Sequence, residues 1–181
     1  MSIYKMIHKP LSDADIKHIL GSDAKILEYF ELNKYSDLVQ LLPNPIDFVI
    51  ILYEEQRLSG HWTCLARRDD LFTFFDSYGL APDAELKWFS PKQRRELGEE
   101  IPRLSQLLRN KQYVYNRHAF QSHNTSVETC GSHVCMFLYC FVREGFTLEQ
   151  YQQFMKQLSK ATHETADQIV ARFTGNMLQR T

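Results

Sequence analysis

Three short apolar runs follow one another closely near the middle of the chain, and this pattern limits the fold more than any other feature. The runs cover residues 47–53, 61–66 and 71–75, and a fourth, QYVY, covers residues 112–115. The links between the first three are short and polar, which is typical of hairpins. Because hairpins join antiparallel neighbours, the sequence predicts a mostly antiparallel central sheet.

Helix signals lie on both sides of these strands in the sequence. Ser12 can cap a helix that ends at Gly21. After the strands, Pro91 suits the first turn of a helix, and Pro102 interrupts the pattern. The sequence therefore predicts two short helices, or one kinked helix, in an insert over about residues 90–110.

The most apolar segment of the chain begins at Cys130 and runs to about residue 144. Its apolar residues recur at helical spacing and cover nearly all sides. A helix of this kind belongs at the centre of a domain. Two amphipathic helices follow, over roughly residues 147–159 and 162–173. We therefore expect an α+β fold in which helices flank the sheet and a buried central helix begins at Cys130.

The chain of 181 residues has the size of one domain, and it contains no internal repeat and no linker rich enough to divide it. We therefore expect a single domain over residues 1–181, with the first helix and the strands in residues 11–80. The net charge of −1 gives no overall positive field to attract nucleic acid or an anionic membrane. The N-terminus lacks the apolar run of a signal peptide, so we expect an intracellular protein with four reduced cysteines and no membrane partner.

Four residues on these elements match what a thiol nucleophile needs. Such a thiol needs an imidazole to take its proton, a carboxylate to orient the imidazole, and donors for an oxyanion. Cys130 lies at a predicted helix start, where the helix dipole favours a thiolate. His61 heads one strand and Asp76 ends the next, so adjacent antiparallel strands can bring them together. Gln121 lies upstream across a polar loop, from which its amide could enter an oxyanion hole.

These residues lie in four short motifs that occur in the order His, Asp, Gln, Cys. The motifs are SGHW at 59–62, FFDSYG at 74–79, YN at 115–116 with Gln121 after it, and TCG at 129–131. Together they resemble the clan of cysteine proteases that includes the adenovirus maturation protease (adenain) and the SUMO-specific proteases. The pattern is closest to the compact viral members, and the resemblance covers roughly residues 11–144.

The resemblance implies a role for each matched residue. It makes Cys130 the nucleophile, His61 the general base, Asp76 the carboxylate that orients it, and Gln121 the oxyanion donor. Trp62 matches an aromatic residue that walls a narrow substrate channel. Members of the clan cleave after small residues, often at Gly-containing sites, because that channel excludes side chains. The resemblance implies no metal and no other cofactor.

The resemblance also implies a biological setting. We expect a viral-type cysteine endopeptidase that cleaves capsid or core precursors during virion maturation, in the virion or the host cytoplasm. One alternative is a deconjugating protease for ubiquitin-like modifiers, and a second is a non-catalytic structural protein that retains the fold. The basic character of the adenovirus enzyme is missing at a net charge of −1, so DNA is not carried over as an activator. Nothing in the chain identifies a docking cysteine for an activating peptide.

Each candidate residue also has a structural alternative. Cys130 could be an inert core thiol, His61 a packed histidine and Trp62 a core aromatic. Asp76 precedes a turn, where Asp is common for local reasons. Asn116 would be the fallback orienter of the histidine if Asp76 faced solvent, and Gln121 could be a solvated loop residue.

A zinc site is a further alternative, because several ligand-type residues lie between residues 118 and 135. They are His118, His123, Cys130, His133 and Cys135. Their spacing lacks the clean second pair of a known zinc motif, so we do not expect one. We expect Cys135 and Cys140 in the core of the central helix, and His133 at the surface or behind the site.

Overall fold

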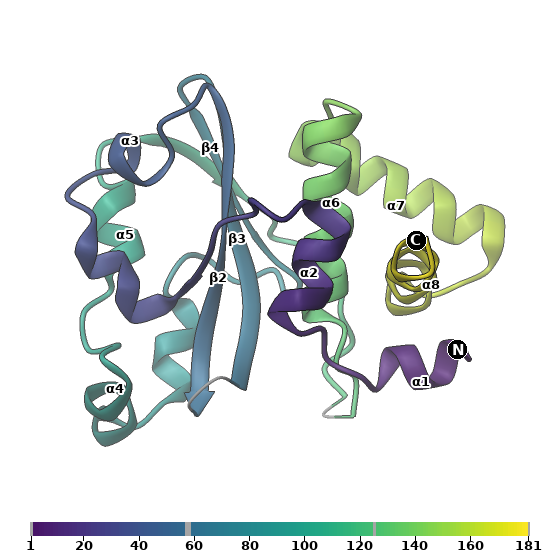
Figure 1. The fold of residues 1–181 in the computed structure, drawn as a ribbon, viewed down its shortest axis with the longest axis horizontal. Coiled ribbons are helices and arrows are strands. Elements are labelled where there is room, and N and C mark those ends of the chain that lie inside the picture. Colours follow the sequence, from purple (N-terminus) through teal and green to yellow (C-terminus); the bar gives the residue numbers. More distant parts are fainter. Residues whose placement is uncertain (1, 57–58, 125, 181) are drawn as a thin grey trace.

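A five-stranded sheet forms the centre of the protein in the computed structural model, which describes residues 2–56, 59–124 and 126–180 (Figure 1). Its strand order is β1-β2-β3-β4-β5, which is also the order along the chain. The strands are β1 (Ile26–Glu28), β2 (Ile46–Gln56), β3 (Ser59–Arg68), β4 (Leu71–Asp76) and β5 (Gln112–Tyr115). With helices on both of its faces, the sheet confirms the predicted α+β class.

The long ladders of the sheet are antiparallel, as the short links predicted. β2 pairs antiparallel with β3, and β3 with β4. The two short outer strands, β1 and β5, pair parallel with β2 and β4. Strand β1 was not predicted, because residues 24–42 carry no clear alternation.

Helices cover both faces of the sheet, and each face has its own apolar cluster (Figure 1). One face carries α2 (Asp13–Leu20), α6 (Cys130–Arg143), α7 (Leu148–Thr162) and α8 (Ala166–Leu178), with α1 (Ile3–Ile7) beside α8. The other carries the 3₁₀ helix η1 (Tyr29–Lys34), α3 (Leu38–Leu41), the 3₁₀ helix η2 (Ala84–Trp88), α4 (Pro91–Leu97) and α5 (Arg103–Leu108). Alternate residues of β2 explain the two layers: Ile50 and Leu52 belong to the first cluster, and Val49 and Ile51 to the second.

Local capping signals predicted the helix starts well. Ser12 caps α2 in a reciprocal capping box with Asp15, and Gly21 ends that helix. The two short helices of the insert are α4 and α5. The start at Thr147 was predicted, but α7 extends to Thr162. The second of the last two helices was predicted too early, because Thr165 forms a capping box with Gln168 and starts α8 at residue 166. Helix α1 and both 3₁₀ helices were not predicted.

Helix α6 is the buried central helix that the apolar segment predicted. Eleven of its 14 residues are buried, beginning with Cys130, and the helix packs against β3. Its start therefore lies in the interior, close to the hairpin strands. No helix in the described part of the chain is long and apolar enough to cross a bilayer.

Candidate active site

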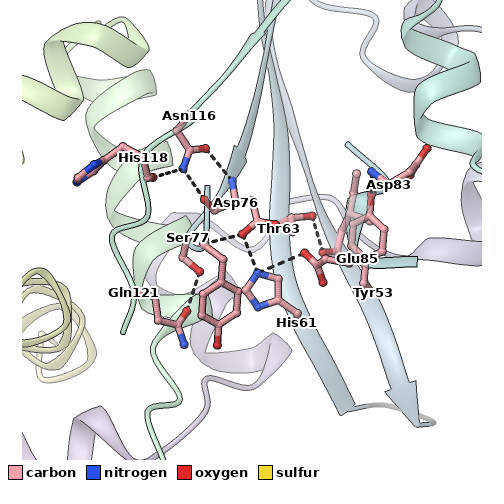
Figure 2. Close-up of polar contacts among 12 residues, drawn as sticks. Tyr53, His61, Thr63, Asp76, Ser77, Asp83, Glu85, Asn116, His118 and Gln121 are labelled. Atoms are coloured by element: carbon pink, nitrogen blue, oxygen red, sulfur yellow. Dashed lines mark hydrogen bonds and ion pairs between the residues drawn. The ribbon is translucent and has the colours of Figure 1, made fainter. Parts of the chain in front are cut away.

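His61 and Asp76 are in contact because of the register between β3 and β4. Thr63 is directly opposite Asp76 in this antiparallel pair, and His61 lies two residues along on the same face. The Nε2 atom of His61 is 3.1 Å from Oδ1 of Asp76, and both side chains are buried. The contact expected from the strand ends is therefore present (Figure 2).

Close packing of the hairpin places His61 at the start of β3. A Cβ atom on the preceding residue, Gly60, would lie only 1.9 Å from the backbone oxygen of Tyr53 on β2. A larger residue at this position would push the two strands apart. Gly60 thus permits the register in which His61 is opposite Tyr53.

Backbone and amide groups hold Asp76 in place. The backbone N–H of Tyr78 donates to Oδ1 of Asp76 at 2.7 Å. Asn116 accepts from the backbone N–H of Asp76 at 3.0 Å and donates to its carbonyl oxygen. Asn116 therefore fixes the backbone at the end of β4, and the histidine is oriented by Asp76.

Cys130, His61 and Gln121 line one cavity of about 340 Å³. Cys130 is the first residue of α6, and its side chain is near enough to His61 to help raise the pKa of that imidazole. The other lining residues come from the β2–β3 hairpin, the end of β4, η2 and the loop before α6; they are Glu55, Ser59, Gly60, Tyr78, Trp88, His123, Val127 and Glu128. The cavity gives a ligand direct access to the thiol and the imidazole.

Gln121 is a fixed, buried residue and not a solvated one. Its Oε1 accepts from the Ser77 hydroxyl at 2.7 Å, and its Nε2 donates to the carbonyl oxygen of Val127 at 3.1 Å. Because the Val127 carbonyl can only accept, the amide nitrogen faces Val127 and the amide oxygen faces Ser77. That nitrogen carries a second N–H, and the side chain borders the cavity beside Cys130.

The carboxyl groups at the site raise the proton affinity of His61 and make it a stronger base. Burial lowers the pKa of His61, but the Glu85 and Asp76 carboxyls and the nearby Cys130 side chain outweigh it and hold this pKa well above its usual value. Burial raises the pKa of Asp76, but the bond and charge of His61 outweigh it and hold this pKa below its usual value. A high proton affinity suits His61 to take a proton from a group in the cavity that it lines.

The sequence assigned no role to two residues of the site. Glu85 on η2 is buried, and its Oε1 lies 3.5 Å from Nε2 of His61 (Figure 2). Tyr78 stacks between two histidine rings, with centroid distances of 4.8 Å to His61 and 5.1 Å to His123. Both contacts depend on how segments far apart in the sequence pack, which no local pattern reports.

Trp62 is not brought together with the other four predicted residues. It is buried, its Nε1 donates to the carbonyl oxygen of Leu11 at 3.3 Å, and it packs closely against Gly131. It is not among the residues that line the cavity beside Cys130. The tryptophan that borders this cavity is Trp88, which is 55% exposed and in edge contact with Tyr78.

The cysteines and histidines considered for zinc do not gather around one point in the described ranges. His133 is fully buried and is hydrogen-bonded to Asp167, so a surface position for it is wrong. Across residues 2–56, 59–124 and 126–180, the one group of three ligand-type side chains close enough for a shared ion is His61, Asp76 and Glu85.

The comparisons with known proteins found a relative in a virophage. The chain is 30% identical over 170 residues to an uncharacterised protein, V9 of Sputnik virophage, and the match covers 91% of this chain and 93% of that protein. No protein-family model matches the chain. Among solved structures, the SUMO protease Ulp1 with its catalytic cysteine oxidised to a sulfinic acid is similar at a TM-score of 0.41 and 14% identity, over 95% of this chain and 82% of that one.

Proposed function

This chain belongs to the same family as V9 of Sputnik virophage, and we propose that it is a viral cysteine endopeptidase. The observation that carries the proposal is His61, which is hydrogen-bonded to Asp76 and lines one cavity together with Cys130. A thiol, a base beside it and a carboxylate that orients the base are the three parts of a cysteine protease triad.

The first half of the reaction is transfer of an acyl group to sulfur. His61 takes the thiol proton, and the sulfur of Cys130 attacks the scissile carbonyl carbon. The oxyanion accepts from the backbone N–H of Cys130 and from the side-chain amide of Gln121, each worth about 10²- to 10³-fold in rate. The imidazolium then gives its proton to the leaving amine, the C–N bond breaks, and a thioester remains.

The second half returns the enzyme to its starting state. His61 takes a proton from water, whose oxygen attacks the thioester carbonyl. The C–S bond breaks, the acid product leaves, and the proton returns to the sulfur of Cys130. Asp76 holds the ring through Nε2 in both halves, which leaves Nδ1 of His61 for these proton transfers.

We further propose that the substrates are capsid or core precursor proteins, cut after small, Gly-containing sequences during virion maturation. The viral relative supports the setting. Two aromatic side chains, Tyr78 and Trp88, border the cavity beside Cys130 and would limit the size of substrate side chains there. The virion or the host cytoplasm is then the place of action.

Active-site labelling with a Gly-Gly vinyl-sulfone peptide tests the proposal directly. We expect covalent labelling of wild-type protein at Cys130, and none in C130A or H61A. The matched control is C140A, which removes another α6 thiol that does not line the cavity. Labelling that persists in C130A, or its absence from folded wild-type protein even with virion extract added, would overturn the proposal and favour a structural protein. Faster cleavage of ubiquitin-like substrates than of capsid-derived peptides would favour a deconjugating protease over one that cuts capsid precursors.

A further inference from the structure

Three carboxyl oxygens behind His61 are buried without a hydrogen-bond donor in the described residues. They are Oδ2 of Asp76 and both oxygens of Glu85. Oδ1 of Asp76 and Oε1 of Glu85 lie 3.1 Å and 3.5 Å from Nε2 of His61, so the two acids share one side of the ring (Figure 2). The site therefore holds two buried acids and a single N–H group between them.

Two ionised carboxylates in this position would be costly. An ionised carboxylate only accepts hydrogen bonds, and buried acceptors without donors are strongly unfavourable. Two negative charges that face the same ring atom of His61 also repel each other in the low-dielectric interior. One proton on one of the acids removes both costs, because it turns an acceptor into a donor.

The neighbouring acid on the same segment shows what a buried carboxyl with hydrogen-bond donors looks like here. Asp83 accepts from the hydroxyls of Tyr29 and Tyr53 and from the backbone N–H of Ser105. Three donors therefore satisfy its two oxygens. Glu85, two residues later, receives no such bonds, and the Tyr53 hydroxyl is already committed to Asp83.

The surroundings decide which of the two acids holds the proton. Asp76 is close to Nε2 of His61 and accepts from the backbone N–H of Tyr78, and its pKa is lowered. Burial, together with the nearby Asp76 and Cys130 groups, raises the pKa of Glu85 well above its usual value despite the opposing charge of His61.

The titratable groups that face Glu85 come from four elements. They are Tyr53 on β2, His61 on β3, Asp76 on β4 and Cys130 on α6. Among these, His61 is the cation, and it is shared with Asp76. The proton therefore belongs on Glu85.

We infer that Glu85 is a positioning residue of the proposed protease site: its protonated carboxyl donates a hydrogen bond to Asp76 and holds that carboxylate toward His61. The inference rests on the proposed function for its catalytic meaning. Glu85 does not line the cavity, so it touches no substrate and acts through Asp76. Its proton also keeps a second negative charge away from the imidazole, whose proton must move during each cycle.

Carbon NMR of protein labelled at the glutamate carboxyl carbons tests whether Glu85 is protonated, and it does not require the protein to be active. The resonance that disappears in E85Q belongs to Glu85. We expect it at the position of a protonated acid at neutral pH. Glu99 is the internal control, because it is a buried glutamate whose pKa is raised to about 7, and its resonance titrates near neutrality. A Glu85 resonance at the ionised position, or one that moves on addition of equimolar Zn²⁺, would overturn the inference.

Kinetics then test the positioning role. E85A removes the donor to Asp76, and we expect kcat to fall about 10- to 100-fold with little change in KM. E85Q restores an N–H donor that cannot ionise, and we expect it to recover most of that loss. An E85Q variant as impaired as E85A would overturn the role. Wild-type protein that cleaves nothing would count against the proposed function alone, since the NMR result stands without it.

Discussion

The Nε2 atom of His133 lies 3.1 Å from Oδ1 of Asp167, and this buried contact ties α6 to α8. The same carboxylate accepts from the hydroxyl of Thr129 at 2.5 Å and from the backbone N–H of Ser122 at 3.0 Å. Thr129 immediately precedes Cys130. One carboxylate on α8 therefore fixes the start of the central helix and the position of the candidate nucleophile.

Loss of this carboxylate is expected to destabilise the protein. D167A leaves the Thr129 hydroxyl and the His133 ring without their acceptor, and we expect a loss of about 2–4 kcal/mol in the free energy of unfolding. Urea denaturation measures it. The control D70A removes an exposed acid and should change stability by less than about 0.5 kcal/mol. Equal effects of the two substitutions would contradict a structural role for Asp167.

The same carboxylate gives stability a dependence on pH. Burial raises the pKa of Asp167, but the bonds from His133 and Thr129 outweigh it and hold the pKa below its usual value. A lowered carboxyl pKa contributes stability that is present above the ordinary Asp value and is lost as pH falls through the folded value. D167A should therefore lose less stability than wild-type protein in the acid range.

Glu99 is expected to give a dependence of the opposite sign. It is fully buried, accepts from the backbone N–H of Glu54 at 2.9 Å, and has its pKa raised by burial from 4.5 to about 7. Between these two pKa values the folded state binds more protons than the unfolded state. The free energy of unfolding therefore falls as pH rises from about 4.5 to about 7. We expect E99Q to remove about 2 kcal/mol of that fall, after allowance for solvent screening. Parallel stability curves for wild-type and E99Q protein from pH 5 to 8 would contradict this.

The four thiols should differ sharply in reactivity. Burial raises the pKa of Cys64 and of Cys135, and it raises that of Cys140 to about 11. Cys130 borders the cavity beside His61, so a small reagent reaches it. We expect brief iodoacetamide treatment near neutral pH to alkylate Cys130 first, as read by mass spectrometry, and more slowly in H61A. First labelling of Cys64 or Cys140 would contradict the assignment.

Substitution of Trp62 should affect stability, and substitution of Trp88 should affect substrate binding. Trp62 is buried against Gly131, and we expect W62A to lose about 3–5 kcal/mol of stability. Trp88 is half exposed at the edge of the cavity, so W88A should keep its melting temperature and raise KM for peptide substrates. If instead a folded W62F variant raised KM more than W88A did, Trp62 would regain the channel role that the family resemblance implied.

Local patterns in the sequence predicted most of the secondary structure. Apolar runs and short polar links predicted the β2–β3–β4 hairpins, and capping residues such as Ser12 and Thr147 predicted helix starts. These signals work because each depends on residues that are close along the chain. Strand β1 and its parallel pairing with β2 were missed, since three residues without alternation carry no such signal.

By itself, the sequence determined the α+β class, the buried helix that starts at Cys130, and the contact between His61 and Asp76, because short links make neighbouring strands antiparallel and limit their register. Only the tertiary structure decided that Glu85 lies beside His61, that Asp167 holds the start of α6, and that Trp88 rather than Trp62 borders the cavity. Those contacts join residues far apart in sequence. They depend on how whole elements pack across the sheet, and no short-range pattern encodes that packing.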